Sequence, residues 1–381
     1  MPLDNQLIAY VALALLTALV ISFLMTPVVK TFAYKVGAVD VPKDARRMHK
    51  VPIPRLGGLA IFIGFMLSVL IFGNVRGSGQ MQSILMGSVI IVVLGVVDDI
   101  MALPAMMKFA VQIIAALIPA LNGVVIQAFS NPNIFSNSLY WVLGPLSIPI
   151  TVLWIVAITN SVNLIDGLDG LANGVYAISA TTMLVIALLA SEADVAIVMA
   201  ALVGACVGFM PYNLNPAKMF MGDTGATFLG FILATMSIQG LFKFYAVISF
   251  AVPFLILGLP IFDTTFAFVR RIAHGQSPMH ADRGHIHHRL IDMGLNQKQA
   301  VATLYVISAM LGLSAVVLTT GGEQKAMLFF AALCIVAVVA ARVVFPKEIR
   351  EELHEELEEL TGHASHEGEK PEPEKKDDSH A

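Results

Sequence analysis

The stretch that decides the fold is MQSILMGSVIIVVLGVVDD, residues 81–99. Its apolar part, residues 81–97, carries no charge and is long enough to cross a bilayer as an α-helix, which takes about 17–25 residues. Asp98 and Asp99 follow directly, at the predicted C-terminal end of the helix, where the helix dipole disfavours negative charge. The stretch therefore predicts a membrane-spanning helix that ends in two carboxylates in need of a partner.

The composition of the whole chain repeats this pattern. Of 381 residues, 57% are apolar and 13% are charged, whereas a soluble protein carries about 25% charged residues. The mean hydropathy is +0.79. The sequence therefore argues against a soluble domain and predicts an all-α, polytopic membrane protein.

Apolar runs of spanning length predict about eleven transmembrane helices. They cover residues 6–26, 57–73, 81–97, 107–129, 142–162, 172–190, 194–210, 225–240, 245–262, 301–320 and 326–345. The first run, Leu7–Met25, is too long for a signal-peptide core and has no basic residue before it, so we expect a true span. Cys206 and Cys334 lie inside apolar runs, which indicates neither a disulfide framework nor a thiolate metal site.

The basic residues predict the orientation, because Lys and Arg concentrate in cytoplasmic loops. An odd number of spans puts the two termini on opposite sides. One side receives 14 basic residues before the tail is counted, and the other receives 3. We therefore expect the N-terminus outside and the C-terminus in the cytoplasm, with the polar motifs gathered as an active site in cytoplasmic loops and helix ends.

Two domains are expected, a membrane-embedded domain over residues 1–346 and an acidic tail over residues 347–381. The tail holds 13 acidic and 5 basic residues and ends in Pro/Glu/Lys low complexity. Such a segment cannot bury a core, so we expect it to be largely disordered. We assign it no chemistry.

Asp98 and Asp99 have two interpretations. They are either a hydrophilic helix end at the membrane interface or part of a site in which a divalent cation or Lys108 neutralises them. Two adjacent carboxylates at the unfavourable end of a helix favour the second interpretation.

A polar stripe follows in NSVNLIDGLDGL, residues 160–171. Asn160, Asn163, Asp166 and Asp169 are spaced by three, so on a helix they would lie along one face. Polar and ionisable groups at membrane depth are costly and usually mark a function. The alternative is a hydrated turn between two spans, which would need no such spacing.

The segment FMGDTG, residues 220–225, opens the predicted eighth span. Asp223 is a good helix N-cap. An Asp at a helix N-terminus could also hold Mg²⁺ against a phosphate that the backbone N–H groups help to bind. Both interpretations stay open on the residues alone.

The segment DRGHIHHR, residues 282–289, is rich in histidine and arginine. A zinc site could use His285, His287 and His288, but no cysteine and no HExxH pair accompanies them. Arg283 and Arg289 beside imidazoles suit the recognition of phosphate and hydroxyl groups better. The remaining alternative is a solvated basic loop.

Together these motifs resemble the polyprenyl-phosphate N-acetylhexosamine-1-phosphate transferase family, glycosyltransferase family 4. The family includes phospho-MurNAc-pentapeptide transferases and the WecA/TagO-type GlcNAc-1-phosphate transferases. The resemblance covers about residues 5–345. It rests on VDD at 97–99, NLIDGLDGLA at 163–172, FMGDTG at 220–225 and HIHHRL at 285–290, with PRLGG at 54–58.

The resemblance implies a role for each matching residue. The catalytic residues would be Asp98, Asp99, Lys108 and His287. The substrate-binding residues would be Asn163, Asp166, Asp169, Phe220 (stacking on uracil), Arg283, His285, His288 and Arg289. Asp223 would be a ligand of Mg²⁺, for which Mn²⁺ could substitute.

The resemblance also implies the reaction and the partners. GlcNAc-1-phosphate would pass from UDP-GlcNAc to undecaprenyl phosphate in the bacterial plasma membrane, as the first membrane step of an envelope glycan such as teichoic acid or O-antigen. The His-Ile-His-His order departs from the three consecutive histidines of the MurNAc-pentapeptide branch, so the muropeptide transferase is the alternative. A homodimer would fit the habit of the family, and no nucleic acid partner is expected.

Two rivals come from other classes. A secondary transporter would use intramembrane polar groups, but it predicts an internal repeat and access from both faces. The motifs show no repeat and lie on one predicted face. A membrane metallohydrolase would need a closed histidine ligand set and a water site.

Overall fold

The computed structural model describes residues 5–42, 51–130, 140–240, 251–273, 275 and 284–321, with single positions at 325, 329 and 331. Helices dominate this part of the chain, which confirms the predicted all-α class. They are α1 (Asn5–Val36), α2 (Gly57–Phe72), α3 (Gly79–Met101), α4 (Ala105–Leu121), α5 (Ser147–Ile165), α6 (Leu171–Leu189), α7 (Ala193–Asn213), α8 (Gly222–Gly240), α9 (Ala251–Ile256), α10 (Gly258–Ala273), α11 (Ile286–Asp292) and α12 (Gln297–Gly321). A 3-10 turn, η1 (Gly144–Leu146), precedes α5.

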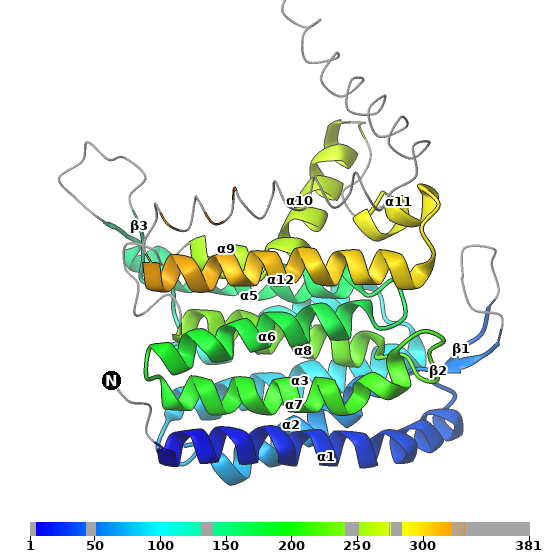
Figure 1. Cartoon of the computed structure of the whole chain (residues 1–381), viewed down its shortest axis with the longest axis horizontal. Helices are drawn as coiled ribbons and strands as arrows, with labels where there is room; N and C mark the ends of the chain where they lie inside the picture. The colour runs from blue at the N-terminus through cyan, green and yellow to red at the C-terminus, as the bar shows by residue number, and fades with distance from the viewer. Residues whose placement is uncertain are drawn as a thin grey trace, which may run out of the picture. The chain divides into compact units, whose positions relative to one another are not determined.

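Four short strands form two antiparallel pairs. β1 (Val39–Asp40) pairs with β2 (Ile53–Pro54), and β3 (Ala128–Ser130) pairs with β4 (Tyr140–Val142). The β1–β2 hairpin lies where the segments after α1 and before α2 meet, at the end of the helix bundle that also carries the polar motifs (Figure 1).

Six helical segments in the described residues are long and apolar enough to cross a membrane. They are Asn5–Val36, Gly79–Met101, Gly144–Ile165, Leu171–Leu189, Ala193–Asn213 and Gln297–Thr320, and α2 and α4 are shorter apolar helices. The long helices run side by side (Figure 1). The protein is therefore a multi-pass membrane protein. The count of eleven and the orientation stay predictions, because most of the predicted span 326–345 lies outside the described residues.

Several predicted boundaries differ from the structure, two of them by eight residues or more. α1 continues ten residues beyond the expected end at residue 26. The hydrogen bonds of a helix are made by its backbone, so the helix can extend past the end of the apolar run. α4 ends at Leu121 instead of near residue 129. The chain turns there through Gly123, whose φ of +87° lies in the left-handed region that glycine adopts readily.

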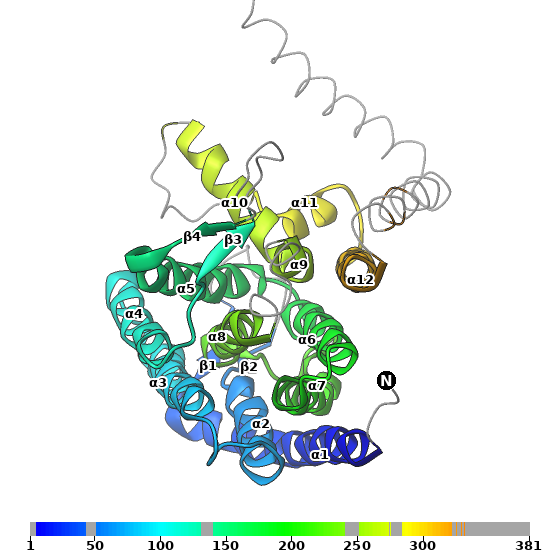
Figure 2. The same cartoon turned by 90° about the vertical axis from the view of Figure 1, so that its left-hand side faces the viewer.

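The predicted ninth span, 245–262, is not one helix in its described part. Residues 251–256 form α9, and α10 starts at Gly258 and leans away from the direction of the bundle (Figures 1 and 2). Pro260 has no N–H to donate to the carbonyl of Ile256, four residues earlier. The Ser179 hydroxyl of α6 donates to that carbonyl instead, at 2.9 Å. Side chains of a neighbouring helix can satisfy a carbonyl freed in this way.

α8 lies at the centre of the bundle, ringed by α2, α3, α5, α6 and α7 (Figure 2). Nearly all its residues from Thr224 to Gly240 are buried, as expected of a helix that is apolar all round. Close approach needs small residues, and a Cβ on Gly58 of α2 would overlap the backbone of Gly225. This packing fixes the first turn of α8, which carries Asp223, at the middle of one end of the bundle.

Candidate active site

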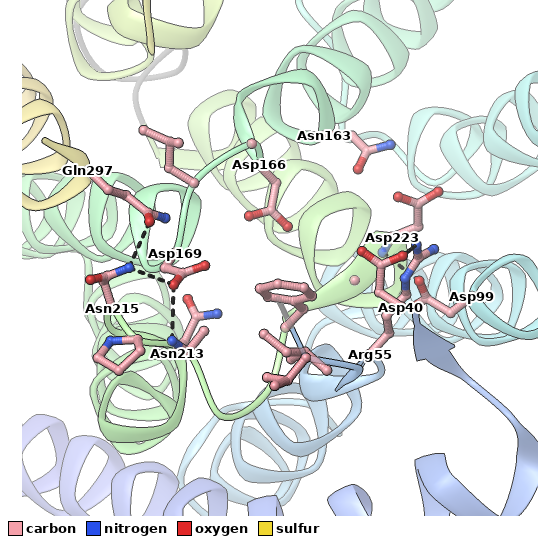
Figure 3. A pocket seen from close by; sticks show the side chains of 18 of the residues that line it. Asp40, Arg55, Asp99, Asn163, Asp166, Asp169, Asn213, Asn215, Asp223 and Gln297 are labelled. Atoms are coloured by element: carbon pink, nitrogen blue, oxygen red, sulfur yellow. Dashed lines mark hydrogen bonds and ion pairs between the residues drawn. The ribbon is translucent and has the colours of Figure 1, made fainter. Parts of the chain in front are cut away.

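A cavity of about 560 Å³ opens at this end of the bundle. All five motif segments singled out in the sequence supply lining residues, and Figure 3 shows Arg55, Asp99, Asp166 and Asp223 among them. The polar lining residues are Asp40, Arg55, Asp99, Asn163, Asp166, Asp169, Asn213, Asn215, Asp223, His288 and Gln297. The convergence that the sequence predicted is therefore present in the tertiary structure.

Asp99 holds the first turn of α8. Its Oδ1 accepts from the N–H of Asp223 at 3.0 Å. Its Oδ2 accepts from the N–H of Thr224 at 3.0 Å and from the Thr224 hydroxyl at 2.6 Å. The N-terminal N–H groups of a helix have no partner inside the helix. The Asp99 carboxylate from α3 satisfies two of them, and the positive end of the α8 dipole stabilises its charge.

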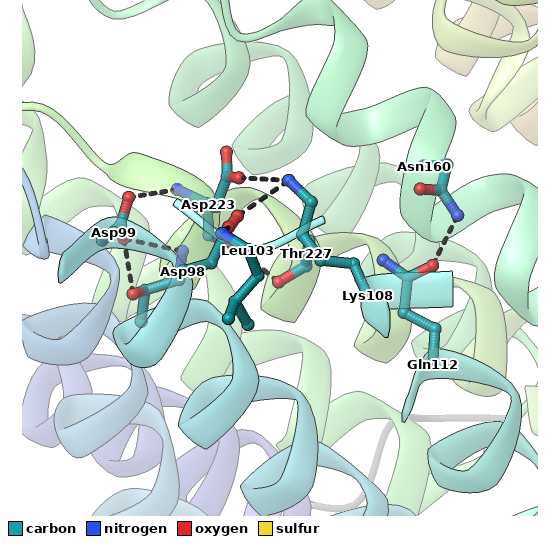
Figure 4. Close-up of polar contacts among 9 residues, drawn as sticks. Asp98, Asp99, Leu103, Lys108, Gln112, Asn160, Asp223 and Thr227 are labelled. Carbon is teal, nitrogen blue, oxygen red and sulfur yellow. Dashed lines mark hydrogen bonds and ion pairs between the residues drawn. The ribbon is translucent and has the colours of Figure 1, made fainter. Parts of the chain in front are cut away.

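Asp98 points instead toward α4. One carboxylate oxygen accepts from the N–H of Leu103 at 2.7 Å, and the other lies 2.8 Å from Nζ of Lys108 (Figure 4). The same ammonium lies 3.1 Å from Oδ2 of Asp223. Lys108 therefore bridges Asp98 and Asp223, and it provides the neutralising charge expected beside the aspartate pair.

The PRLGG and FMGDTG segments are joined through their backbones. The N–H of Phe220 donates to the carbonyl of Pro54 at 2.9 Å, and the N–H of Gly57 donates to that of Phe220 at 2.9 Å. The N–H of Gly58 donates to the carbonyl of Met221 at 2.8 Å. These bonds hold the backbone of Phe220, which lines the cavity.

The four residues of the predicted polar stripe do not share one role: the first connects two helices, and the other three line the cavity. Asn160 donates to Gln112 of α4 at 2.7 Å, which ties α5 to α4 (Figure 4). Asn163, Asp166 and Asp169 line the cavity. Because α5 ends at Ile165, the last two lie on a loop, and the continuous helical stripe expected from the spacing is not formed.

The two loop aspartates differ in their surroundings. Oδ2 of Asp169 accepts from the side-chain amide of Asn215 at 2.9 Å and from the N–H of Ala217 at 3.0 Å. Removal from bulk solvent raises the pKa of Asp166 to about 7, and the charges of Asp223, Asp99 and Asp169 add to this. The Asp166 carboxyl therefore gains most from a positive charge brought into the cavity.

The histidine segment reaches the cavity through one ring, that of His288. His285 and His287 are buried. Nδ1 of His285 lies 2.8 Å from Oδ2 of Asp263 on α10. Burial, with His288 and His285 nearby, lowers the pKa of His287 to about 4, so its imidazole is neutral at pH 7.

The arginines of this segment do not line the cavity where they are described. Arg289 lies with its guanidinium 5.5 Å from the centre of the Phe266 ring, and Arg283 lies outside the described residues. The substrate-binding roles of Arg283 and Arg289, and the catalytic role of His287, stay predictions.

Several cavity residues were not expected from the sequence. Arg55 belongs to the PRLGG motif, and its guanidinium contacts Asp40 at 2.6 Å. Asn213 is the last residue of α7, and Asn215 follows it in the loop before FMGDTG. Gln297, which accepts from Asn215 at 2.7 Å, opens α12 and carries no local signal, because only the packing of α12 brings it to the cavity.

The charge of the cavity bears on what it can bind. Five carboxylates and one guanidinium line it among the described residues. No group of three or more His, Cys, Asp or Glu side chains in this part of the chain is arranged to hold a metal by itself. Mg²⁺ is commonly held by one or two carboxylates together with substrate phosphates and water. The residues therefore fit a cation that enters with a phosphorylated substrate.

The fold and the site define a multi-pass membrane transferase, and the comparisons give its family. Residues 81–241 match the model of Glycosyl transferase family 4, and the chain belongs to this family. It is 42% identical over 316 residues to a protein of Bacillus subtilis (strain 168) named "Probable undecaprenyl-phosphate N-acetylglucosaminyl 1-phosphate transferase", covering 83% of this chain and 87% of that protein.

Two further relatives carry related names. The "Decaprenyl-phosphate N-acetylglucosaminephosphotransferase" of Mycolicibacterium smegmatis is 35% identical, over 77% of this chain and 79% of the relative. The "Undecaprenyl-phosphate alpha-N-acetylglucosaminyl 1-phosphate transferase" of Thermotoga maritima is 32% identical, over 71% and 78%. With its apolar helices, this chain is a multi-pass protein of the bacterial plasma membrane.

Proposed function

We propose that the chain transfers GlcNAc-1-phosphate from UDP-GlcNAc to undecaprenyl phosphate, forming undecaprenyl-diphospho-GlcNAc and UMP. The observation that carries the proposal is the cavity at the first turn of α8, where Asp223 meets Lys108 and the loop of Asp166 and Asp169. The relatives named for this transfer support the donor and the acceptor.

The donor nucleotide fits the wall formed by Phe220 and the 213–217 segment. An aromatic ring offers a stacking surface for uracil, and base–aromatic stacking contributes about 1–3 kcal/mol per base. Asp169 holds the 213–217 segment in place through Asn215 and Ala217. We therefore infer that Phe220 stacks on the uracil and that Asp169 stabilises the segment that forms the rest of the uracil subsite.

The diphosphate belongs beside Asp223. Two anionic phosphates would be repelled by the five lining carboxylates unless cations enter with them. A Mg²⁺ ion on Asp223 would supply this charge and stabilise the charge that develops on the leaving UMP. Lys108 and Arg55 are the neighbouring protein cations that support it.

The transfer itself is a direct displacement. An oxygen of the lipid phosphate attacks the phosphorus next to the sugar, and the bond from that phosphorus to the bridging oxygen breaks, so the electron pair leaves with UMP. A phosphate monoester has a second pKa of about 6, so the acceptor is mostly dianionic at pH 7 and needs no strong base. Such chemistry depends on positioning and charge neutralisation.

The contacts of the aspartate pair favour this route over an aspartyl-phosphate intermediate. Both oxygens of Asp99 accept bonds from the first turn of α8. Both oxygens of Asp98 are engaged by Leu103 and Lys108. We infer that Asp99 positions Asp223 and that Asp98 positions Lys108.

The experiment uses purified full-length protein in detergent with UDP-GlcNAc, undecaprenyl phosphate and Mg²⁺. UMP and lipid-linked GlcNAc should appear together, stop on chelation with EDTA and resume with added Mg²⁺, with Mn²⁺ tested as a substitute. UMP release that does not depend on the lipid would indicate a hydrolase. No release at all would remove the proposal and leave a transporter as the alternative.

A further inference from the structure

Asp263 lies on α10, outside every motif that defines the family resemblance. Its side chain is 3% exposed. A buried carboxylate is costly unless it is paired and hydrogen-bonded. Here Oδ2 lies 2.8 Å from Nδ1 of His285, and Oδ1 accepts from the N–H of Ile286 at 2.8 Å. Both oxygens are therefore directed at the start of the histidine segment.

The Asp263 carboxylate supplies a hydrogen-bond acceptor that the N-terminus of α11 lacks. His285 is the N-cap residue of α11, and its side chain makes no capping hydrogen bond. The first N–H groups of a helix need outside acceptors. Asp263 provides one for Ile286 and holds the imidazole of the cap residue with its other oxygen. A carboxylate acceptor favours a hydrogen on Nδ1 of His285, and the contact holds the ring in position.

The same face of α10 makes further contacts with this segment. Residues 263, 266 and 270 follow a spacing that places them on one side of a helix. Nη1 of Arg270 donates to the carbonyl of Gly284 at 2.8 Å. The Phe266 ring lies 5.5 Å from the guanidinium carbon of Arg289. α10 therefore holds the segment 284–289 at three successive points, of which Asp263 is the buried one.

A row of imidazoles leads from Asp263 to the cavity. The rings of His285 and His287 are stacked, with centroids 5.8 Å apart and planes 10° apart. The rings of His287 and His288 follow at 4.3 Å and 43°. His288 is the member of the row that lines the cavity, and His287 rests against Gly167 of the loop that carries Asp166 and Asp169.

We propose that Asp263 is a positioning residue for the transfer reaction. Through His285 and the first turn of α11, it fixes the row of imidazoles so that His288 faces the reacting phosphate and His287 supports the 166–170 loop. This inference rests on the proposed function. It adds a residue that touches neither substrate and acts only through the histidine segment.

The kinetic test compares Asp263→Ala, His285→Ala, the double variant and the control Asp292→Asn. The control removes one exposed carboxylate from α11 itself. Because a misplacement of about 1 Å can cost about 100-fold in rate, each single variant should lose about 10–100-fold in kcat. KM for UDP-GlcNAc should change little, since Phe220, Asp169 and Asn215 stay in place. The double variant should lose no more than the worse single variant, and the control should match the parent enzyme.

Three outcomes would overturn the inference. They are normal kcat in Asp263→Ala, losses that multiply in the double variant, and a rise in KM that accounts for the whole loss. A second measurement does not depend on activity. Amide hydrogen exchange of α11 should accelerate in Asp263→Ala and stay unchanged in Asp292→Asn. Unchanged exchange of α11 in Asp263→Ala would also reject the proposal. An inactive parent enzyme with the expected exchange pattern would refute the proposed function and leave the positioning contact standing.

Discussion

Replacing Gly167 by alanine tests the packing of the histidine segment against the DGLDG loop. Gly167 is not among the glycines with a left-handed φ in the described chain, so alanine is compatible with its backbone. The obstacle is space. An added Cβ would lie 2.9 Å from Cε1 and 3.0 Å from Cδ2 of His287, and closer still to Nε2.

The expected size of the effect follows from this geometry. Ordinary contact starts at 3.4 Å, so the ring or the loop must move by at least 0.5 Å at Cε1 and by more at Nε2. Asp166 is the neighbouring residue and moves with the loop. Since a displacement of about 1 Å can reduce a rate about 100-fold, we expect kcat to fall about 10–100-fold, or about 1.4–2.7 kcal/mol.

The assay is UMP release at saturating UDP-GlcNAc and undecaprenyl phosphate, with thermal unfolding in detergent as a check of the fold. Gly79→Ala is the matched control, because a Cβ there meets nothing within 4 Å. In a His287→Ala background, the ring is gone and Gly167→Ala should have little further effect. An equal loss in both backgrounds, or full activity of Gly167→Ala alone, would refute the reasoning.

Four further predictions follow from the sequence and the site. Asp223 lies inside the first turn of α8 and is not its N-cap, contrary to one of the two interpretations of the sequence. Asp223→Asn should therefore abolish UMP release while expression and membrane insertion stay normal, because Asn keeps the size of the side chain but weakens a Mg²⁺ site; near-normal turnover would remove the metal assignment. A panel of sugar nucleotides with detection of the lipid product should favour UDP-GlcNAc over UDP-MurNAc-pentapeptide, and efficient transfer from the latter would overturn the choice of branch. Truncation after Arg350 should leave UMP release by purified protein unchanged; a loss seen only in complementation of cells would point to a partner of the tail. The raised pKa of Asp166 means that the folded state binds its proton more tightly than the unfolded state, so this group lowers the stability of metal-free protein as pH rises from about 4 to about 7. Asp166→Asn should flatten that part of the unfolding curve against pH, and an unchanged slope would contradict the shift.

The helices of this protein were largely predictable from the sequence, because each membrane span is selected by its own transfer into the bilayer. That energy is a sum over adjacent residues, so a scan for apolar runs recovers α2, α3 and α5–α8 nearly as they are. The same scan missed the break at Leu257. A hydropathy scan measures how apolar the side chains are and not whether the helix axis bends. Pro260 therefore scores the same in a broken helix as in a continuous one.

The motifs were also visible in the sequence, but the hydrogen-bond partner of each motif residue was not. Asp98 and Asp99 are neighbours in the chain, yet one bonds Lys108 and the other caps α8. Consecutive residues of a helix point about 100° apart, so this separation follows from the helix. Which partner each one meets depends on where α4 and α8 pack.

The composition, the spans, the motif residues and the family resemblance were thus determined by local features of the chain. The tertiary structure alone decided that Asp99 caps a helix 125 residues later, that Asp263 pairs with His285 and that Gln297 reaches the cavity. A hydrogen bond of a buried group must find its partner wherever packing brings one within about 3 Å. Nothing in the local sequence records that distance, because it is set by how helices remote in the chain fit against α8.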